Sequence, residues 1–195
     1  EKLVLGVDYV KCLPLELVKK RLRPQLQRKD LKQIYHNYGF DYHIIRRYFD
    51  AKPVCYFDTM IAQAILDENQ PKALKKMATY YLKIPSDTYA ELFENMSFDQ
   101  VPILIDPKTR TGNIATYYAT KDTELTYKMY EFQYKHLTSH KLKKLHDLYF
   151  NIEIPFINVV VKVEERGVKV DKEYLVNEVA PKLHKELNEL EEKIH

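Results

Sequence analysis

The chain has 195 residues, of which 45% are hydrophobic and 30% are charged. This length and composition allow one full domain with a substantial core, and they exclude a disordered or fibrous chain. Lysine and arginine (31) nearly balance aspartate and glutamate (28), so net charge alone does not indicate a nucleic-acid partner.

Cysteine content and apolar runs bear on the cellular location. Cys12 and Cys55 are too few for a disulfide framework, so a reducing intracellular compartment is expected, such as the cytoplasm. No apolar run is long enough to span a bilayer, and no signal-like segment precedes the apolar run 3–7. We therefore expect no membrane partner.

The first part of the chain alternates predicted strands and helices. Strands are predicted at 3–7, 31–35 and 54–57, and helices at 15–26 and 40–49. Pro24 is a local irregularity inside the first helix. This alternation predicts an α/β fold.

From Asp58 onward the sequence is predicted to be mainly helical. Helices are expected over 60–66, 71–81, 90–95, 113–136, 142–165 and from 171 toward 194. Asp58, Asn113 and Asp171 are suitable helix caps, and Gly167 is a stop signal. Residues 168–170 are predicted to be extended, and 87–111 to be a loop region around its short helix.

Two local arrangements could carry chemistry. In the segment His36 to Asp41 a predicted strand gives way to a helix, and Gly39 permits a tight turn that presents Asp41 at the sheet edge. Tyr118 and Asp122 are four residues apart, so on a helix they share one face. On spacing alone, a helix cap is the favoured explanation of Asp41, and an exposed polar pair is the favoured explanation of Tyr118 with Asp122.

Several common catalytic motifs are absent from the sequence, and His36 and the basic residues have ordinary structural explanations as well. The chain has no Gly-rich phosphate loop, no zinc-spaced Cys and His cluster and no Gly-x-Ser-x-Gly elbow. His36 has no partner at ligand spacing, so a structural or surface role is expected. The basic residues crowded between Lys19 and Lys32 are either a solvated helix face or a surface that follows phosphates.

Taken in order, these segments resemble the 3′–5′ exonuclease (proofreading) domain of family A, polymerase I-like DNA polymerases. The segment 36–41 resembles the second exonuclease motif, Asn-x-x-(Tyr/Phe)-Asp, and 118–122 resembles the third, Tyr-x-x-x-Asp. The segments 57–66 and 73–82 are similar to the helices that lie between these motifs. The tail, 152–155 followed by 163–171, resembles the junction into the polymerase domain.

The resemblance implies a ribonuclease H-like fold, an α/β arrangement in which helices flank a mixed sheet, here lacking its first strand or strands and followed by long helices. Residues 1–140 would be an N-terminally incomplete exonuclease domain. Residues 141–195 would form a helical junction and the start of the polymerase domain. The remainder of the polymerase chain would be a partner, in an intracellular compartment that contains DNA.

The resemblance also implies the site chemistry. Two divalent metal ions, Mg²⁺ or Mn²⁺, would act on the single-stranded 3′ end of DNA, with Asp41 and Asp122 among their ligands. The Tyr118 hydroxyl would orient the attacking water. DNA-binding roles would fall to three further residues: Asn37 would contact the terminal nucleotide, and Phe40 or Tyr89 would stack on a base.

One departure from the family pattern changes the expected activity. The first motif, Asp-x-Glu, does not occur upstream of Asp41: Asp8 follows an apolar run, but Val10 stands where the glutamate would be. We therefore expect weak metal binding and weak or no DNA cleavage by this chain. The chain begins with Glu1, so either an upstream strand is missing or the domain is a degenerate remnant.

Three readings follow. The first is an exonuclease fragment of an active proofreading polymerase. The alternative is a catalytically degenerate, structural or DNA-binding module with the same fold, whose basic stretch supplies the contacts. The third is a stand-alone ribonuclease of the same superfamily, and the junction segment ending at Asp171 argues against it.

Overall fold

The computed structural model describes residues 13–93 and 114–194. The chain divides into two compact units, one extending to Lys162 and one beginning at Val163. The predicted strand at 3–7, Asp8, Cys12 and the Asn113 cap lie outside the described residues. None of the helices in the described ranges combines the length and the apolar character that a bilayer span requires.

A small parallel sheet lies at the centre of the first unit. Strand β1 (Gln33–Tyr35) pairs with β2 (Cys55–Asp58), and Tyr35 lies opposite Asp58. Helix α2 (Tyr38–Phe49) makes the crossover that parallel strands require. The predicted alternation of strand and helix is confirmed here, although the sheet has only two strands within the described residues.

The carboxylate of Asp58 organises the start of two helices. Its Oδ1 accepts from the N–H groups of Met60 (2.8 Å) and Ile61 (3.2 Å), which caps α3 (Thr59–Leu66) as the sequence predicts. Its Oδ2 accepts from Tyr38 N–H at 2.7 Å, at the first residue of α2. One buried side chain thereby ties the end of β2 to both helices.

The turn that leads into α2 differs from the prediction. Asn37, with φ 69° and ψ 60°, takes the left-handed conformation, and Gly39 lies inside the helix. Asparagine tolerates this conformation better than most residues. The Asn37 N–H also donates to Asp58 Oδ1 at 3.3 Å, so the turn is held by hydrogen bonding and does not require glycine.

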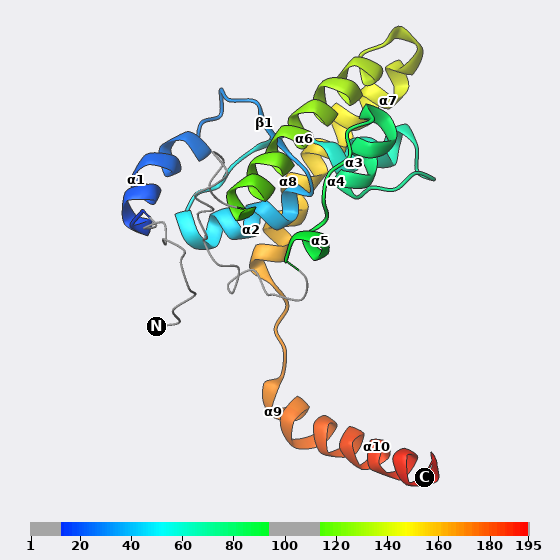
Figure 1. Cartoon of the computed structure of the whole chain (residues 1–195). Helices are drawn as coiled ribbons and strands as arrows, with labels where there is room; N and C mark the ends of the chain where they lie inside the picture. The colour runs from blue at the N-terminus through cyan, green and yellow to red at the C-terminus, as the bar shows by residue number, and fades with distance from the viewer. Residues whose placement is uncertain (1–12, 94–113, 195) are drawn as a thin grey trace, which may run out of the picture. The chain divides into compact units, whose positions relative to one another are not determined.

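Further helices surround the sheet (Figure 1). Helix α1 (Leu15–Leu26) precedes β1 and contacts α2. Helix α4 (Leu74–Met77) starts three residues after the predicted Pro71 and continues into the π-helical segment η1 (Ala78–Leu82). The short helix α5 (Tyr89–Phe93) follows. The long α6 (Ile114–Leu137) packs against β1, α3 and α4.

The predicted helix over 142–165 is a run of consecutive segments that packs on the sheet. A single 3₁₀ turn (η2, His140–Leu142) leads into α7 (Lys143–Leu148), the π-helical η3 (Tyr149–Glu153) and α8 (Ile154–Arg166). Pro155 is the second residue of α8, just after the π-helical stretch, and its missing amide hydrogen removes one α-helical hydrogen bond there.

The core is rich in aromatic rings. It contains residues from β2, α2, α3, the end of α6 and the helical run after residue 142, namely Tyr38, Tyr42, Cys55, Phe57, Ala62, Leu137, Tyr149, Ile154 and Val161. The Tyr149 hydroxyl donates to the Asp58 carbonyl (3.0 Å) and accepts from the Asp58 N–H (2.7 Å). A side chain from η3 therefore satisfies both backbone groups of a strand residue.

The second unit contains the end of α8 and a last helical run. Gly167 ends α8 with φ +68°, a conformation that favours glycine. Residues 168–170 are in neither helix nor strand. Asp171 then accepts from Tyr174 N–H at 3.0 Å and caps α9 (Lys172–Tyr174), η4 (Leu175–Val179) and α10 (Ala180–Ile194), which confirms the predicted cap.

Candidate functional site

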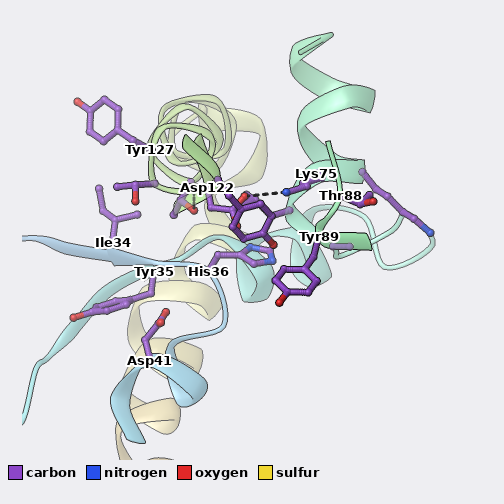
Figure 2. A pocket seen from close by; sticks show the side chains of 15 residues that line it. Ile34, Tyr35, His36, Asp41, Lys75, Thr88, Tyr89, Asp122 and Tyr127 are labelled. Atoms are coloured by element: carbon purple, nitrogen blue, oxygen red, sulfur yellow. Dashed lines mark hydrogen bonds and ion pairs between the residues drawn. The ribbon is translucent and has the colours of Figure 1, made fainter. Parts of the chain in front are cut away.

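A cavity of about 720 Å³ opens at the carboxyl end of β1 (Figure 2). Its lining combines the end of the strand with side chains from α2, α4, α5 and α6. The residues that bear on chemistry are Tyr35, His36, Asp41, Lys75, Tyr89, Tyr118 and Asp122. Clefts at the carboxyl ends of parallel strands are common ligand sites.

Asp41 enters the cavity from the first turn of α2. Burial, followed by the negative charge of Asp58, raises the pKa of the Asp41 carboxyl to about 6. In Figure 2, Asp41 and Asp122 lie on the two sides of the segment that carries Tyr35 and His36. The two carboxylates thus share one cavity, and a cation bound near Asp41 would favour its charged form against the burial and the repulsion that raise its pKa.

Tyr118 and Asp122 lie one turn apart on α6, and both line the cavity as their spacing predicts. Burial and the adjacent Asp122 carboxylate raise the pKa of the Tyr118 hydroxyl. The hydroxyl therefore keeps its proton at neutral pH and can orient a water molecule through hydrogen bonds. The Asp122 Oδ1 atom is buried and accepts no hydrogen bond from the residues that the structure describes.

Lys75 supplies a cation to the same corner of the cavity. Its Nζ lies 3.5 Å from Asp122 Oδ1 and 3.7 Å from the centroid of the Tyr118 ring. The ammonium also donates to the Asp87 carbonyl. With a side chain only 15% exposed, Lys75 partly neutralises Asp122 and covers one face of the tyrosine.

The three residues predicted to bind DNA lie in different places. Tyr89 lines the cavity, with its ring centroid 5.8 Å from that of Tyr118 and 4.8 Å from that of Phe93. Asn37 and Phe40 are not among the lining residues, and Phe40 is 66% exposed. Only Tyr89 therefore forms part of the wall.

His36 has a structural contact, as its isolation in the sequence suggests. Its Nδ1 lies 2.8 Å from the Thr59 hydroxyl, and burial lowers the pKa of the imidazole. Within the described residues no group of three His, Cys, Asp or Glu side chains is placed to hold a metal ion.

The donor set nevertheless fits a hard cation. Asp41 and Asp122 present carboxylate oxygens to one cavity, and Asp122 Oδ1 has no hydrogen-bond donor among residues 13–93 and 114–194. Magnesium commonly takes one or two carboxylates and completes its shell with water and substrate phosphate. These two residues can therefore contribute to such a site, whereas a pair of ions would need further carboxylates.

Lys75 is the residue that sequence reasoning missed. Lys75 is adjacent to Lys76 in a basic segment, and nothing in the sequence indicates which of the two side chains reaches the site. The structure distinguishes them, because Lys75 contacts Asp122 and Tyr118 whereas Lys76 is exposed. Only the packing of α4 against α6 identifies the lysine that reaches the carboxylate.

Comparisons with known proteins bear on this site. A family model described as 3′-5′ exonuclease matches residues 6–138. The chain is similar to DNA polymerase I of Borreliella burgdorferi, with 34% identity over 146 residues, which cover 74% of this chain and 15% of that protein. It is also similar to DNA polymerase I of Chloroflexus aurantiacus, with 31% identity over 169 residues, covering 84% of this chain and 17% of that protein. The chain thus spans about a sixth of the length of these two relatives.

Proposed function

Because this chain belongs to the 3′-5′ exonuclease family of polymerase I-like DNA polymerases, we propose that it is the part of such a polymerase that removes nucleotides from DNA 3′ ends. The partners would be a single-stranded 3′ end and the remainder of the polymerase chain, in an intracellular compartment that contains DNA. The observation that carries the proposal is the presence of Asp41, Tyr118 and Asp122 on one cavity.

Each of these residues has a role that its surroundings support. Asp41 and Asp122 would hold divalent metal ions, which when bound polarise the scissile phosphate and lower the pKa of a bound water. The protonated Tyr118 hydroxyl would orient the attacking water. Tyr89, in the wall beside Tyr118, would stack on the terminal base.

Two further DNA contacts are proposed outside the cavity. Asn37 would contact the terminal nucleotide from the turn before α2, where its side chain is exposed. Phe40, on the exposed side of the first turn of α2, would stack on an unpaired base.

We propose a ribonuclease H-like fold for this domain, with a boundary near residue 140. The two-stranded parallel sheet with its crossover helix is compatible with part of such a fold. No Asp-x-Glu occurs upstream of Asp41, so this chain offers fewer carboxylates than a pair of metal ions requires. We expect cleavage by this chain to be weak or absent.

A second candidate function is a catalytically degenerate domain that supports the polymerase or binds DNA without cutting it. The specific observation in its favour is the Lys75 ammonium, which lies 3.5 Å from Asp122 Oδ1, where it competes with a metal ion. In this reading the lysine replaces part of the positive charge that a metal ion would supply.

The test is nucleotide release from a 3′-labelled single strand in Mg²⁺ or Mn²⁺, with EDTA as the blank. The chain is compared with a form extended upstream in its native gene, and each form carries Asp122→Ala or the control Asp147→Ala. Asp147 is a half-exposed carboxylate on α7, and it does not line the cavity. Activity of the extended form that only Asp122→Ala abolishes supports the nuclease. If neither the chain nor its extended form releases nucleotides, the result supports the catalytically degenerate domain.

A further inference from the structure

A second cavity, of about 360 Å³, lies between α1 and the carboxyl-terminal end of α2. It shares no lining residue with the cavity that contains Asp41. Its walls carry Glu16, Lys19, Lys20, Arg23, Arg47, Tyr48, Phe49 and Asp50, and we call it the basic groove. Four of these eight side chains are cationic and two are anionic.

The two carboxylates of the basic groove are already engaged. Asp50 accepts from Arg23 at 2.8 Å, across the interface of the two helices, and from Arg46 one turn earlier. The Arg46 hydrogen bond, followed by the charge of Arg23, lowers the pKa of Asp50. Glu16 accepts from Lys19 at 2.8 Å. Asp50 therefore joins α1 to α2 and does not repel an anion from the remaining cations.

Lys20 and Arg47 are the cations left for a ligand. Neither forms an ion pair within the described part of the chain, and they approach the groove from α1 and α2 respectively. The Arg47 guanidinium carbon lies 5.6 Å from the centroid of the Tyr48 ring, and Tyr48 is 45% exposed. Cations interleaved with an exposed aromatic ring are the combination that binds single-stranded nucleic acid.

Helix α2 connects this groove to the first cavity. Asp41 lies in its first turn and Arg47 six residues later, a rise of about 9 Å along the helix axis. A strand whose end lies beside Asp41 could therefore reach the groove within a few nucleotides. The concave shape favours a chain-like ligand over a flat anionic membrane, which would contact a basic surface from outside.

We propose that the basic groove is a second nucleic-acid site, which binds the backbone of single-stranded DNA away from the cavity with Asp41. Lys20 and Arg47 pair with phosphates, and Tyr48 stacks on a base. The site goes beyond the proposed nuclease and does not require that nuclease to be active, because binding needs neither metal ions nor hydrolysis.

The test measures binding of a fluorescent oligothymidylate to the full chain by anisotropy in EDTA, over a series of salt concentrations. The double variant Lys20→Gln/Arg47→Gln is compared with Lys143→Gln/Lys144→Gln, which removes the same charge from exposed positions on α7. The groove variant should bind at least tenfold more weakly at low salt. Its log–log salt slope should be about 1.4 shallower, since each phosphate contact on a single strand contributes about 0.7.

A second pair of variants tests the stacking. Tyr48→Ala should weaken binding of the long oligonucleotide about tenfold, within the range for base stacking on an aromatic side chain. Tyr80→Ala is the control, because Tyr80 is similarly exposed and has Lys83 over its ring. It should leave the affinity unchanged.

Three results would overturn the proposal. The groove and control variants could lose affinity equally, which would show dependence on net charge alone. The groove variant could bind DNA normally yet fail to bind phosphatidylserine vesicles, which would make the groove a membrane contact. Tyr80→Ala could weaken binding as much as Tyr48→Ala. Because every reaction contains EDTA, absence of nuclease activity would leave these outcomes unaltered.

Discussion

Replacing Lys75 with methionine removes one charge from the cavity while keeping the length of the side chain. The ammonium lies 3.5 Å from Asp122 Oδ1, and the two side chains are 15% and 31% exposed. At that distance and an effective dielectric constant of about 20, the attraction is about 5 kcal/mol. Desolvation of both groups offsets much of it, so we expect a net loss of about 1 to 2 kcal/mol. For a chain of this size, Tm should fall by about 2 to 8 °C.

The assay is thermal unfolding in EDTA, followed by circular dichroism, on a double-mutant cycle. The cycle contains Lys75→Met, Asp122→Asn and the double variant, with Lys76→Met as the exposed neighbouring control. The double variant should lose less stability than the sum of the single variants, because each single variant leaves a charge without its partner. Additive losses would refute the ion pair. So would an equal drop in Tm for Lys76→Met.

The same variants test competition between lysine and metal ion. If the Lys75 ammonium competes with a metal ion for the Asp122 carboxylate, removing it should strengthen metal binding. Mn²⁺ should then raise the Tm of Lys75→Met more than that of the parent chain. An equal or smaller rise would show that Lys75 does not compete with a divalent ion.

Three further predictions concern pH, the core and a helix cap. Burial raises the folded pKa of Asp41 to about 6, above its ordinary value of 3.8, so the folded state binds this proton more tightly. Because the group is partly exposed and solvent screens its interactions, the free energy of unfolding should fall by about 1 to 2 kcal/mol as pH rises from 4 to 6. Asp41→Asn should flatten this part of the urea-derived stability profile. Tyr149→Phe should cost about 1 to 3 kcal/mol in urea unfolding, since it leaves the buried N–H of Asp58 without its acceptor, whereas Tyr127→Phe at an exposed ring should be neutral. Asp171→Ala should cost the last helix about 1 kcal/mol, seen as lost ellipticity at 222 nm and as earlier amide exchange in the residues it caps.

Local sequence signals predicted most of the secondary structure. Helix α1 has the predicted bounds, Leu15–Leu26, and the caps at Asp58 and Asp171 are confirmed. These elements depend on periodicity and on side chains that bond to their own helix, which are properties of neighbouring residues. The start of α4 was less predictable: Pro71 is a good first helical residue, but the helix begins at Leu74.

Features that depend on distant contacts could not be predicted. The turn before α2 uses Asn37 in place of Gly39, because Asp58, from the next strand, holds the backbone there. For the candidate site, the spacing of Tyr118 and Asp122 predicted their shared face, and the cavity contains both. The contact of Lys75 with Asp122 arises from packing between separate helices, for which one sequence carries no signal.

The pairing of Tyr149 with the backbone of Asp58 limits how this chain can be dissected. The polymerase junction is proposed to begin near residue 140. A fragment that stops there would lack the Tyr149 hydroxyl, which forms hydrogen bonds with both the carbonyl and the N–H of Asp58 at the end of β2. It would also lose Ile154 and Val161 from the core. The shortest piece that can be expressed and folded with its interior intact must therefore retain α8 at least to Val161, and proteases should find no cleavable linker between 140 and 161.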